Sequence, residues 1–167
     1  MEEYVYDAKY LRRQDFEEGK VLFETWDPNA RYAWDAGIAI GRFLKELKAG
    51  RLIGTHCAEC GRVLVPPRMF CEHCFELVDA WVPLQDTGEV VTYSLCYVTW
   101  DMKRIEEPQI PAVVAIDGAA PGLGFMHLLG EVDPDAVEIG MRVKAVWKPA
   151  EERIGSITDI AYFKPLE

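Results

Sequence analysis

The chain has 167 residues, half of them apolar, and contains no low-complexity tract, so its composition excludes a mainly disordered protein. The net charge of −10 repels phosphate backbones and counts against nucleic-acid binding. The sequence has no run of about 18 apolar residues and no basic, then apolar leader, which predicts a cytoplasmic protein that does not enter membranes.

The first third of the chain predicts two helices. An irregular amphipathic pattern predicts a helix over residues 7–26, which ends at the turn Asp27-Pro28-Asn29. A more regular pattern predicts a helix over residues 34–49, followed by Gly50 as the residue that closes it. The apolar stripes of these helices have two interpretations: packing on the chain's own core, or docking on a partner subunit.

Four of the five cysteines form two pairs, each with a gap of two residues, and ten residues separate the pairs: Cys57, Cys60, Cys71 and Cys74. A gap of two residues lets both sulfurs of a pair reach one ion, and two pairs supply the ligands of a tetrahedral site. Gly61 directly follows the first pair and allows a sharp turn that aims amide groups at the sulfur. The spacing predicts a closed structural zinc site held by four thiolates.

Other uses of these thiols are iron binding in an electron carrier, a catalytic zinc with an open position, and a redox dithiol. Four cysteine ligands disfavour the open catalytic site. His56 and His73 each adjoin a cysteine and are alternative ligands. Arg62 and Arg68 lie between the pairs and would either offset the negative charge of the site or be solvated surface residues.

Five β-type runs separated by turn-forming residues follow the cysteines and predict a small closed barrel of the OB type. The predicted strands are 89–100, 112–117, 125–132, 142–148 and 157–163. The predicted fold class is therefore α+β, mainly β. It comprises N-terminal helices in an extension over residues 1–50, a rubredoxin-like zinc ribbon over 51–82, and a C-terminal five-stranded OB-fold barrel over 83–167.

The sequence has no nucleophile elbow, zinc-protease helix or phosphate-binding loop. Cys96 and His127 are the candidates for a cysteine–histidine pair, but both fall in predicted strands, where a free cysteine usually behaves as a small apolar residue. We therefore predict no catalytic residues in this chain and place the catalytic machinery on another one.

The glycine-rich segment 118–124 has two interpretations. Its glycines would let a ligand's phosphate or amide approach the backbone closely, and Phe125 would add an apolar wall. A flexible hairpin connection explains the glycines as well, and core packing explains Phe125.

Three segments carry a resemblance to a known family: FLKELKAGRL at 43–52 continuing through both cysteine pairs, DTGEVVTYS at 86–94, and EIGMRV at 138–143. Over about residues 34–164 the chain resembles the acyl-CoA-associated OB-fold proteins with an N-terminal rubredoxin-like zinc ribbon, formerly a domain of unknown function. The resemblance implies a structural zinc ion and an accessory subunit that binds a CoA thioester in a hetero-complex with a thiolase-like catalytic subunit.

Residues 1–33 form an extension that shorter family members lack, and longer members act with thiolases on bulky aromatic or steroid acyl-CoAs. The candidate CoA contacts are Arg68, Gly122, Gly124 and Phe125. The alternative function is a nucleic-acid-binding module in which Tyr93, Tyr97 and Trp100 stack on bases, against which the net acidity counts.

Overall fold

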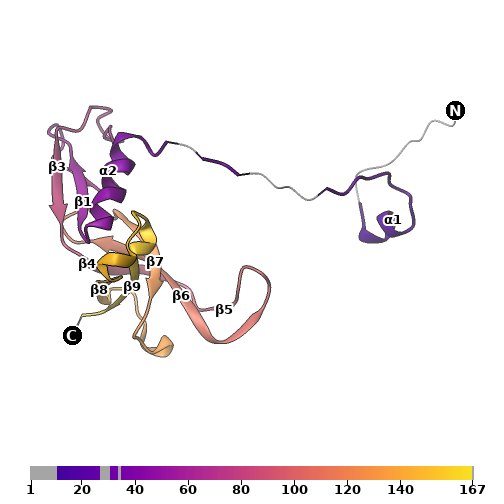
Figure 1. The fold of residues 1–167 in the computed structure, drawn as a ribbon. Helices are drawn as coiled ribbons and strands as arrows, with labels where there is room; N and C mark the ends of the chain where they lie inside the picture. The colour runs from indigo at the N-terminus through magenta and orange to yellow at the C-terminus, as the bar shows by residue number, and fades with distance from the viewer. Residues whose placement is uncertain (1–10, 27–30, 34, 167) are drawn as a thin grey trace. The chain divides into compact units, whose positions relative to one another are not determined.

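A computed structural model describes residues 11–26, 31–33 and 35–166 of the chain (Figure 1). The chain divides into two compact units, Met1–Trp34 and Asp35–Glu167. The described part of the first unit contains one short helix, α1 (Arg13–Glu17). The predicted helix over 7–26 is thus too long, since the chain turns back at Gly19 with a left-handed φ of +69°. Its first residues, 7–10, lie outside the described residues.

The first unit leaves large apolar side chains in contact with solvent. Leu22, Phe23 and Trp26 have 88%, 61% and 73% of their surface exposed. Phe23 forms an edge-to-face pair with Phe16, with ring centroids 5.4 Å apart. These residues therefore do not form a core within the described part of this unit.

The second unit begins with α2 (Gly37–Lys48), which confirms the second predicted helix with a later start. Trp34 lies outside the described residues. Gly50 closes the helix as expected, with a φ of +73° and its N–H donating to the carbonyl of Leu47 at 2.8 Å. Phe43 and Leu47 are buried in the core of this same unit. The C-terminal part of the α2 stripe therefore packs on the chain's own core, whereas Ile38 near its start is 71% exposed.

The cysteine segment forms a three-stranded antiparallel sheet of β1 (Leu52–His56), β2 (Val63–Leu64) and β3 (Ala80–Leu84), with β1 in the centre. The strands approach closely at Gly54, where a Cβ atom would lie 2.7 Å from the carbonyl oxygen of Leu64. Figure 1 shows α2 lying beside this sheet.

The remaining strands form the predicted barrel. They are β4 (Thr87–Tyr93), β5 (Cys96–Val98), β6 (Arg104–Ile116), β7 (Gly124–Leu129), β8 (Arg142–Trp147) and β9 (Ile160–Pro165). Five of them run in the order β4-β8-β9-β7-β6, and pairing of β4 with β6 closes the sheet. The β7–β9 pairing is parallel, and the others are antiparallel. Short 3-10 turns, η2 (Pro134–Ala136), η3 (Ala150–Glu152) and η4 (Ile157–Asp159), lie between the last three strands.

Four predicted strands have limits that differ by more than one residue in the structure, and the third ends at Leu129 instead of residue 132. The first divides into β4 and β5, and the fifth begins as the turn η4. The second starts at Arg104 instead of residue 112, because the prolines do not end the strand: Pro108 lies where β6 pairs with the short β5, and Pro111 lies opposite Leu128 of β7. The β5–β6 hairpin extends away from the barrel (Figure 1). Near its tip, Trp100 and Met102 are 96% and 84% exposed.

One apolar core joins α2, the ribbon sheet and the barrel. Sixteen buried residues form it: Phe43, Leu47, Leu52, Ile53, Val65, Val90, Ile110, Ala112, Val114, Ile116, Leu129, Val137, Val143, Ala145, Ile160 and Phe163. The ribbon is therefore fixed against the barrel by shared packing. Within the described ranges, no helix is both long enough and apolar enough to cross a membrane.

Candidate metal centre

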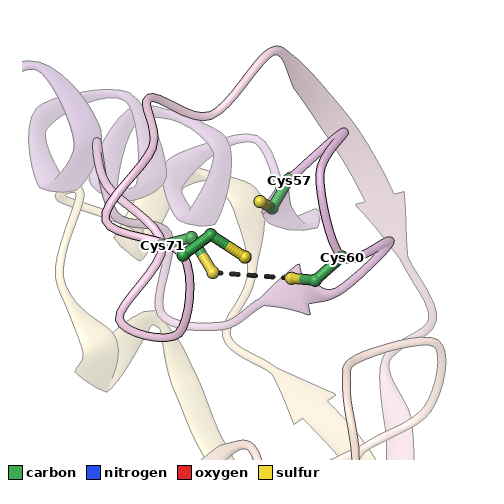
Figure 2. Close-up of side chains that lie close together, drawn as sticks. Cys57, Cys60 and Cys71 are labelled. Carbon is green, nitrogen blue, oxygen red and sulfur yellow. Dashed lines mark hydrogen bonds between the residues drawn. The ribbon is translucent and has the colours of Figure 1, made fainter.

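The four predicted cysteine ligands converge on one point. The Sγ atoms of Cys57, Cys60, Cys71 and Cys74 all lie within 4.8 Å of one another, and none is in a disulfide. Figure 2 shows the sulfurs of Cys57, Cys60 and Cys71 turned toward each other, with 3.6 Å between those of Cys60 and Cys71. A tetrahedral zinc with Zn–S bonds of about 2.3 Å holds its sulfurs about 3.8 Å apart. The arrangement fits a closed four-thiolate zinc site.

The two cysteine pairs are built by the same backbone pattern. In each pair, the first cysteine donates its N–H to the carbonyl five residues later and accepts from the N–H four residues later. The bonds are Cys57 to Arg62 at 3.0 Å, Gly61 to Cys57 at 2.8 Å, Cys71 to Glu76 at 2.9 Å and Phe75 to Cys71 at 2.9 Å. Each pair is therefore a turn whose backbone hydrogen bonds are local.

Both turns place the residue after their second cysteine in the left-handed region. Gly61 has a φ of +70°, which confirms the sharp turn predicted there. The equivalent residue of the second turn is Phe75, with a φ of +59° and 82% of its surface exposed. This conformation could not be predicted from the residue type, because a phenylalanine rarely adopts it.

Backbone amide groups, neighbouring thiols and burial shift the pKa values of the cysteine thiols in opposite directions. The backbone N–H groups of Cys74 and His73 donate to the Cys71 sulfur and lower the pKa of Cys71 to about 7. In contrast, contact with the Cys60 thiol and burial raise the pKa of Cys74 to about 12. Four thiolates this close together would repel one another. A zinc ion held by these cysteines would supply the positive charge that offsets four thiolates.

Arg62 and Arg68 both pair with Glu72, at 3.2 and 3.0 Å. The amide of Glu72 and then the two guanidinium groups lower the pKa of its carboxyl group. The Thr55 hydroxyl accepts from the N–H of Arg68 at 3.1 Å and donates to its carbonyl oxygen at 3.0 Å, which fixes the backbone of Arg68. His56 pairs with Asp79 at 2.9 Å, so its ring does not replace a cysteine ligand.

The other candidate CoA contacts each have a place in the fold. Gly122 takes a left-handed turn with a φ of +76°. At Gly124 a Cβ atom would lie 1.8 Å from the Val114 carbonyl oxygen, so glycine allows β7 to approach β6. The Phe125 ring packs against the core with its centroid 6.1 Å from that of Phe163. Contact of these residues with CoA stays a prediction.

Both ring nitrogens of His127 already have backbone partners. Nδ1 accepts from the N–H of Leu128 at 2.9 Å, and Nε2 lies 3.3 Å from the carbonyl oxygen of Ile157. Cys96 lies in β5, opposite Gln109 of β6. The structure therefore does not present His127 as a base for the Cys96 thiol.

The aromatic residues of the alternative function do not share one exposed face. Tyr93 packs against the core, whereas Tyr97 and Trp100 lie on the β5–β6 hairpin with 47% and 96% of their surfaces exposed. Asp101 pairs with Lys103 beside Trp100, at 2.6 Å. A base-stacking platform of the three residues is therefore absent from the described part of the chain.

A cleft of about 600 Å³ that the sequence did not indicate lies between α2, the ribbon sheet and the barrel. Arg42 comes from α2, Trp81 from β3 and Lys144 from β8, and all three line it. No local spacing links residues from three separate elements, which is why sequence reasoning missed this cleft. None of the four candidate CoA contacts lines it.

Comparison with known proteins agrees with this combination of ribbon and barrel. Residues 44–78 match the rubredoxin-like zinc ribbon domain of ChsH2, and residues 81–148 match its C-terminal OB-fold domain. A DUF35 domain-containing scaffold protein of Methanocaldococcus jannaschii is 34% identical over 119 residues, which cover 70% of this chain and 82% of that protein. The chain belongs to the DUF35 family. The resemblance inferred from the sequence is thereby confirmed.

Other relatives and solved structures also match a large part of the present chain. A DUF35 scaffold protein of Methanothermobacter thermautotrophicus is 28% identical over 120 residues, covering 68% of this chain and 86% of its own. The Ltp2-ChsH2(DUF35) aldolase matches with a TM-score of 0.57 and 25% identity, over 81% of this chain and 98% of that one. A DUF35 protein of unknown function from Sulfolobus solfataricus has a TM-score of 0.54 and 27% identity, over 63% and 75%.

A further relative is a probable enoyl-CoA hydratase alpha subunit of Thermomonospora curvata, 29% identical over 109 residues. The match covers 64% of this chain but 32% of that protein. The names of these relatives link the DUF35 family to scaffolding and to enzymes of acyl-CoA metabolism. They support an acyl-CoA-related accessory role for the present chain.

Proposed function

We propose that this DUF35 protein is a non-catalytic, acyl-CoA-binding accessory subunit of a thiolase-type complex. The observation that carries the proposal is the joining of a closed four-thiolate ribbon to an OB barrel, which is also the domain pair of ChsH2 in the Ltp2-ChsH2(DUF35) aldolase. A closed site leaves no open metal position for substrate. The substrates that we favour are bulky aromatic or steroid acyl-CoAs, in line with the longer family members that the sequence resembles.

Exposed apolar side chains support association with a partner. Leu22, Phe23 and Trp26 are exposed in the first unit, and Trp100 and Met102 are exposed on the β5–β6 hairpin. Large apolar side chains gathered on the surface of a soluble protein commonly mark interaction sites. Because α2 packs on the chain's own core, we assign the docking role that was expected of both N-terminal helices to the residues before Asp35.

The association is tested by co-expressing the chain with a candidate thiolase-like subunit, followed by size-exclusion chromatography. Three forms are compared: the full chain, the chain without residues 1–33, and a full chain with Trp26→Ser and Phe23→Ser. We expect the full chain to co-elute and the other two to lose most of the complex while keeping their zinc. A full chain that never co-elutes contradicts the accessory role. A truncated chain that co-elutes with undiminished affinity contradicts docking through the extension.

The non-catalytic role has its own test. We expect the isolated, zinc-loaded chain to leave acyl-CoA thioesters unchanged in assays of thiolysis and hydrolysis. Thioester turnover by the isolated chain that disappears with Cys96→Ala would show that an active site lies in this chain.

A further inference from the structure

The cleft between α2, the ribbon sheet and the barrel concentrates positive charge on an acidic protein. Its lining contains the cations Arg42, Arg51 and Lys144 and the acids Glu46 and Asp86, whereas the whole chain has a net charge of −10. Cations gathered in a concave site on an otherwise anionic surface attract anions locally. The lining therefore favours a negatively charged ligand.

Both acids of the cleft already accept hydrogen bonds from other side chains of the chain. Glu46 accepts a hydrogen bond from Nε of Arg51 at 2.8 Å and forms an ion pair with its Nη2 at 2.6 Å. Asp86 accepts from the indole N–H of Trp147 at 3.2 Å. Arg42 and Lys144 have no carboxylate partner among the ion pairs of residues 11–26, 31–33 and 35–166. These two side chains supply donors that a phosphate group can use.

The cleft also offers an apolar surface beside the cations. Arg42 lies over the ring of Trp81, with its guanidinium carbon 4.4 Å from the ring centroid. Leu52, Ile53 and Leu84 continue the lining. A volume of about 600 Å³ is within the range of small-molecule sites, which combine apolar walls with a few placed polar groups. Inorganic phosphate alone would leave this apolar surface unused.

We propose that this cleft binds the phosphorylated nucleotide end of CoA, with Arg42 and Lys144 contacting its phosphates and the surface around Trp81 receiving the base. The choice of nucleotide rests on the acyl-CoA role proposed above. The assignment places the nucleotide of CoA away from Arg68, Gly122, Gly124 and Phe125, none of which lines the cleft.

The test measures binding by isothermal titration calorimetry to the full-length, zinc-loaded chain. The probes are CoA, adenosine 3′,5′-bisphosphate, pantetheine and inorganic phosphate. The variants are Arg42→Gln, Lys144→Gln and the double variant, and the control is Lys45→Gln. Lys45 is exposed on the same helix, does not line the cleft, and loses the same charge on substitution. Zinc content and the unfolding temperature verify that each variant is folded.

We expect CoA and the bisphosphate to bind and inorganic phosphate and pantetheine to bind far more weakly. Each single variant is expected to weaken binding of the bisphosphate about tenfold, because a charge-assisted hydrogen bond is lost. Lys45→Gln is expected to change it less than about twofold, because an exposed charge outside the site is screened. Binding to the wild-type chain is expected to weaken as salt is added.

Different failures have different meanings. Undiminished CoA binding by the double variant overturns the cleft assignment but leaves the acyl-CoA role standing. Absence of saturable bisphosphate binding to the wild-type chain also overturns the cleft assignment, and CoA binding to the same sample then decides the acyl-CoA role separately. Equal affinity for inorganic phosphate and the bisphosphate overturns the nucleotide as the ligand class.

Discussion

The zinc ribbon and the barrel are each stabilised in a different way. The ribbon contributes to the shared core and also has a small cluster of its own, whose three buried residues are Cys57, Leu64 and Cys71. Two of these are predicted zinc ligands. The barrel closes around a core that spans five strands, with Phe163 fully buried in it. The ribbon's ligands thus replace the apolar side chains that a small module cannot supply. The two regions should therefore fail under different perturbations.

The largest effect is expected from removing the metal. Chelation of zinc, or Cys71→Ser, should unfold the cysteine turns, since structural zinc contributes about 10–16 kcal/mol of apparent binding energy in zinc-finger peptides. Hydrogen exchange should show lost protection at the amides of Gly61 and Phe75, while β6 and β7 keep theirs. Cys96→Ser is the control and should retain one zinc per chain. Native protein without zinc, or equal loss of protection in the barrel, would contradict the division between the two regions.

The barrel should respond most strongly to a cavity in its core. Phe163→Ala removes a side chain that is fully buried and should lower the free energy of unfolding by about 3–5 kcal/mol. Met126→Ala on neighbouring β7 is the control, because its side chain is 69% exposed and its loss should change stability by less than about 0.5 kcal/mol. Denaturant unfolding measures both. Zinc content should stay at one per chain, and its loss in Phe163→Ala would show that the ribbon depends on the barrel core.

A buried carboxylate gives the barrel a pH dependence. Asp159 accepts hydrogen bonds from the N–H groups of Ile154, Gly155 and Ser156, at 2.9, 2.8 and 3.1 Å. Burial raises the pKa of Asp159, but these three donors outweigh it and hold the pKa below its ordinary value. Its contribution to stability is therefore present above about pH 4, the unfolded value, and is lost as the pH falls through the lower folded value.

Asp159→Asn should lower the free energy of unfolding by about 1–3 kcal/mol at neutral pH, because the buried amides lose an acceptor. The difference from the wild-type chain should shrink as the pH falls below about 4. Asp135→Asn, at an exposed acid, is the control and should leave both the stability and its pH profile unchanged. A difference between Asp159→Asn and wild type that is constant over the acid range would contradict the assignment to the carboxylate.

The same contrast explains what the sequence could predict. The four cysteines that the spacing grouped do converge in the structure, because both turns are local and their spacing alone brings the sulfurs together. The barrel's strand count and closure were also predicted, and β8 matches its expected range within one residue. The start of β6 was missed because Pro108 and Pro111, a residue type that usually interrupts strands, lie within it, and the part before Ile110 pairs with the short β5. The cleft of Arg42, Trp81 and Lys144 depends on how three elements pack, which one sequence does not give.

The smallest expected change in stability comes from exchanging residue types between the two cysteine turns. Gly61 and Phe75 occupy equivalent left-handed positions, but an L-residue with a side chain pays about 1–2 kcal/mol to adopt that conformation. A Cβ atom at Gly61 would meet no atom within 4 Å, so Gly61→Ala should cost only this backbone strain, about 1 kcal/mol. Phe75→Gly relieves the strain and loses little contact, because Phe75 is 82% exposed. The greater freedom of glycine in the unfolded chain offsets part of the gain, leaving about 0.5–1 kcal/mol of stabilisation.

The Phe75→Gly and Gly61→Ala variants are compared with Phe75→Ala by thermal unfolding and by competition for zinc with a chelator. Phe75→Ala keeps the strained backbone and removes the ring, so it should leave stability within about 0.5 kcal/mol of wild type. If Phe75→Gly and Phe75→Ala both weaken zinc retention by the same amount, the ring itself supports the second turn. The strain would then be offset by contacts of the side chain, and the two turns would differ in how they are stabilised despite sharing one hydrogen-bond pattern.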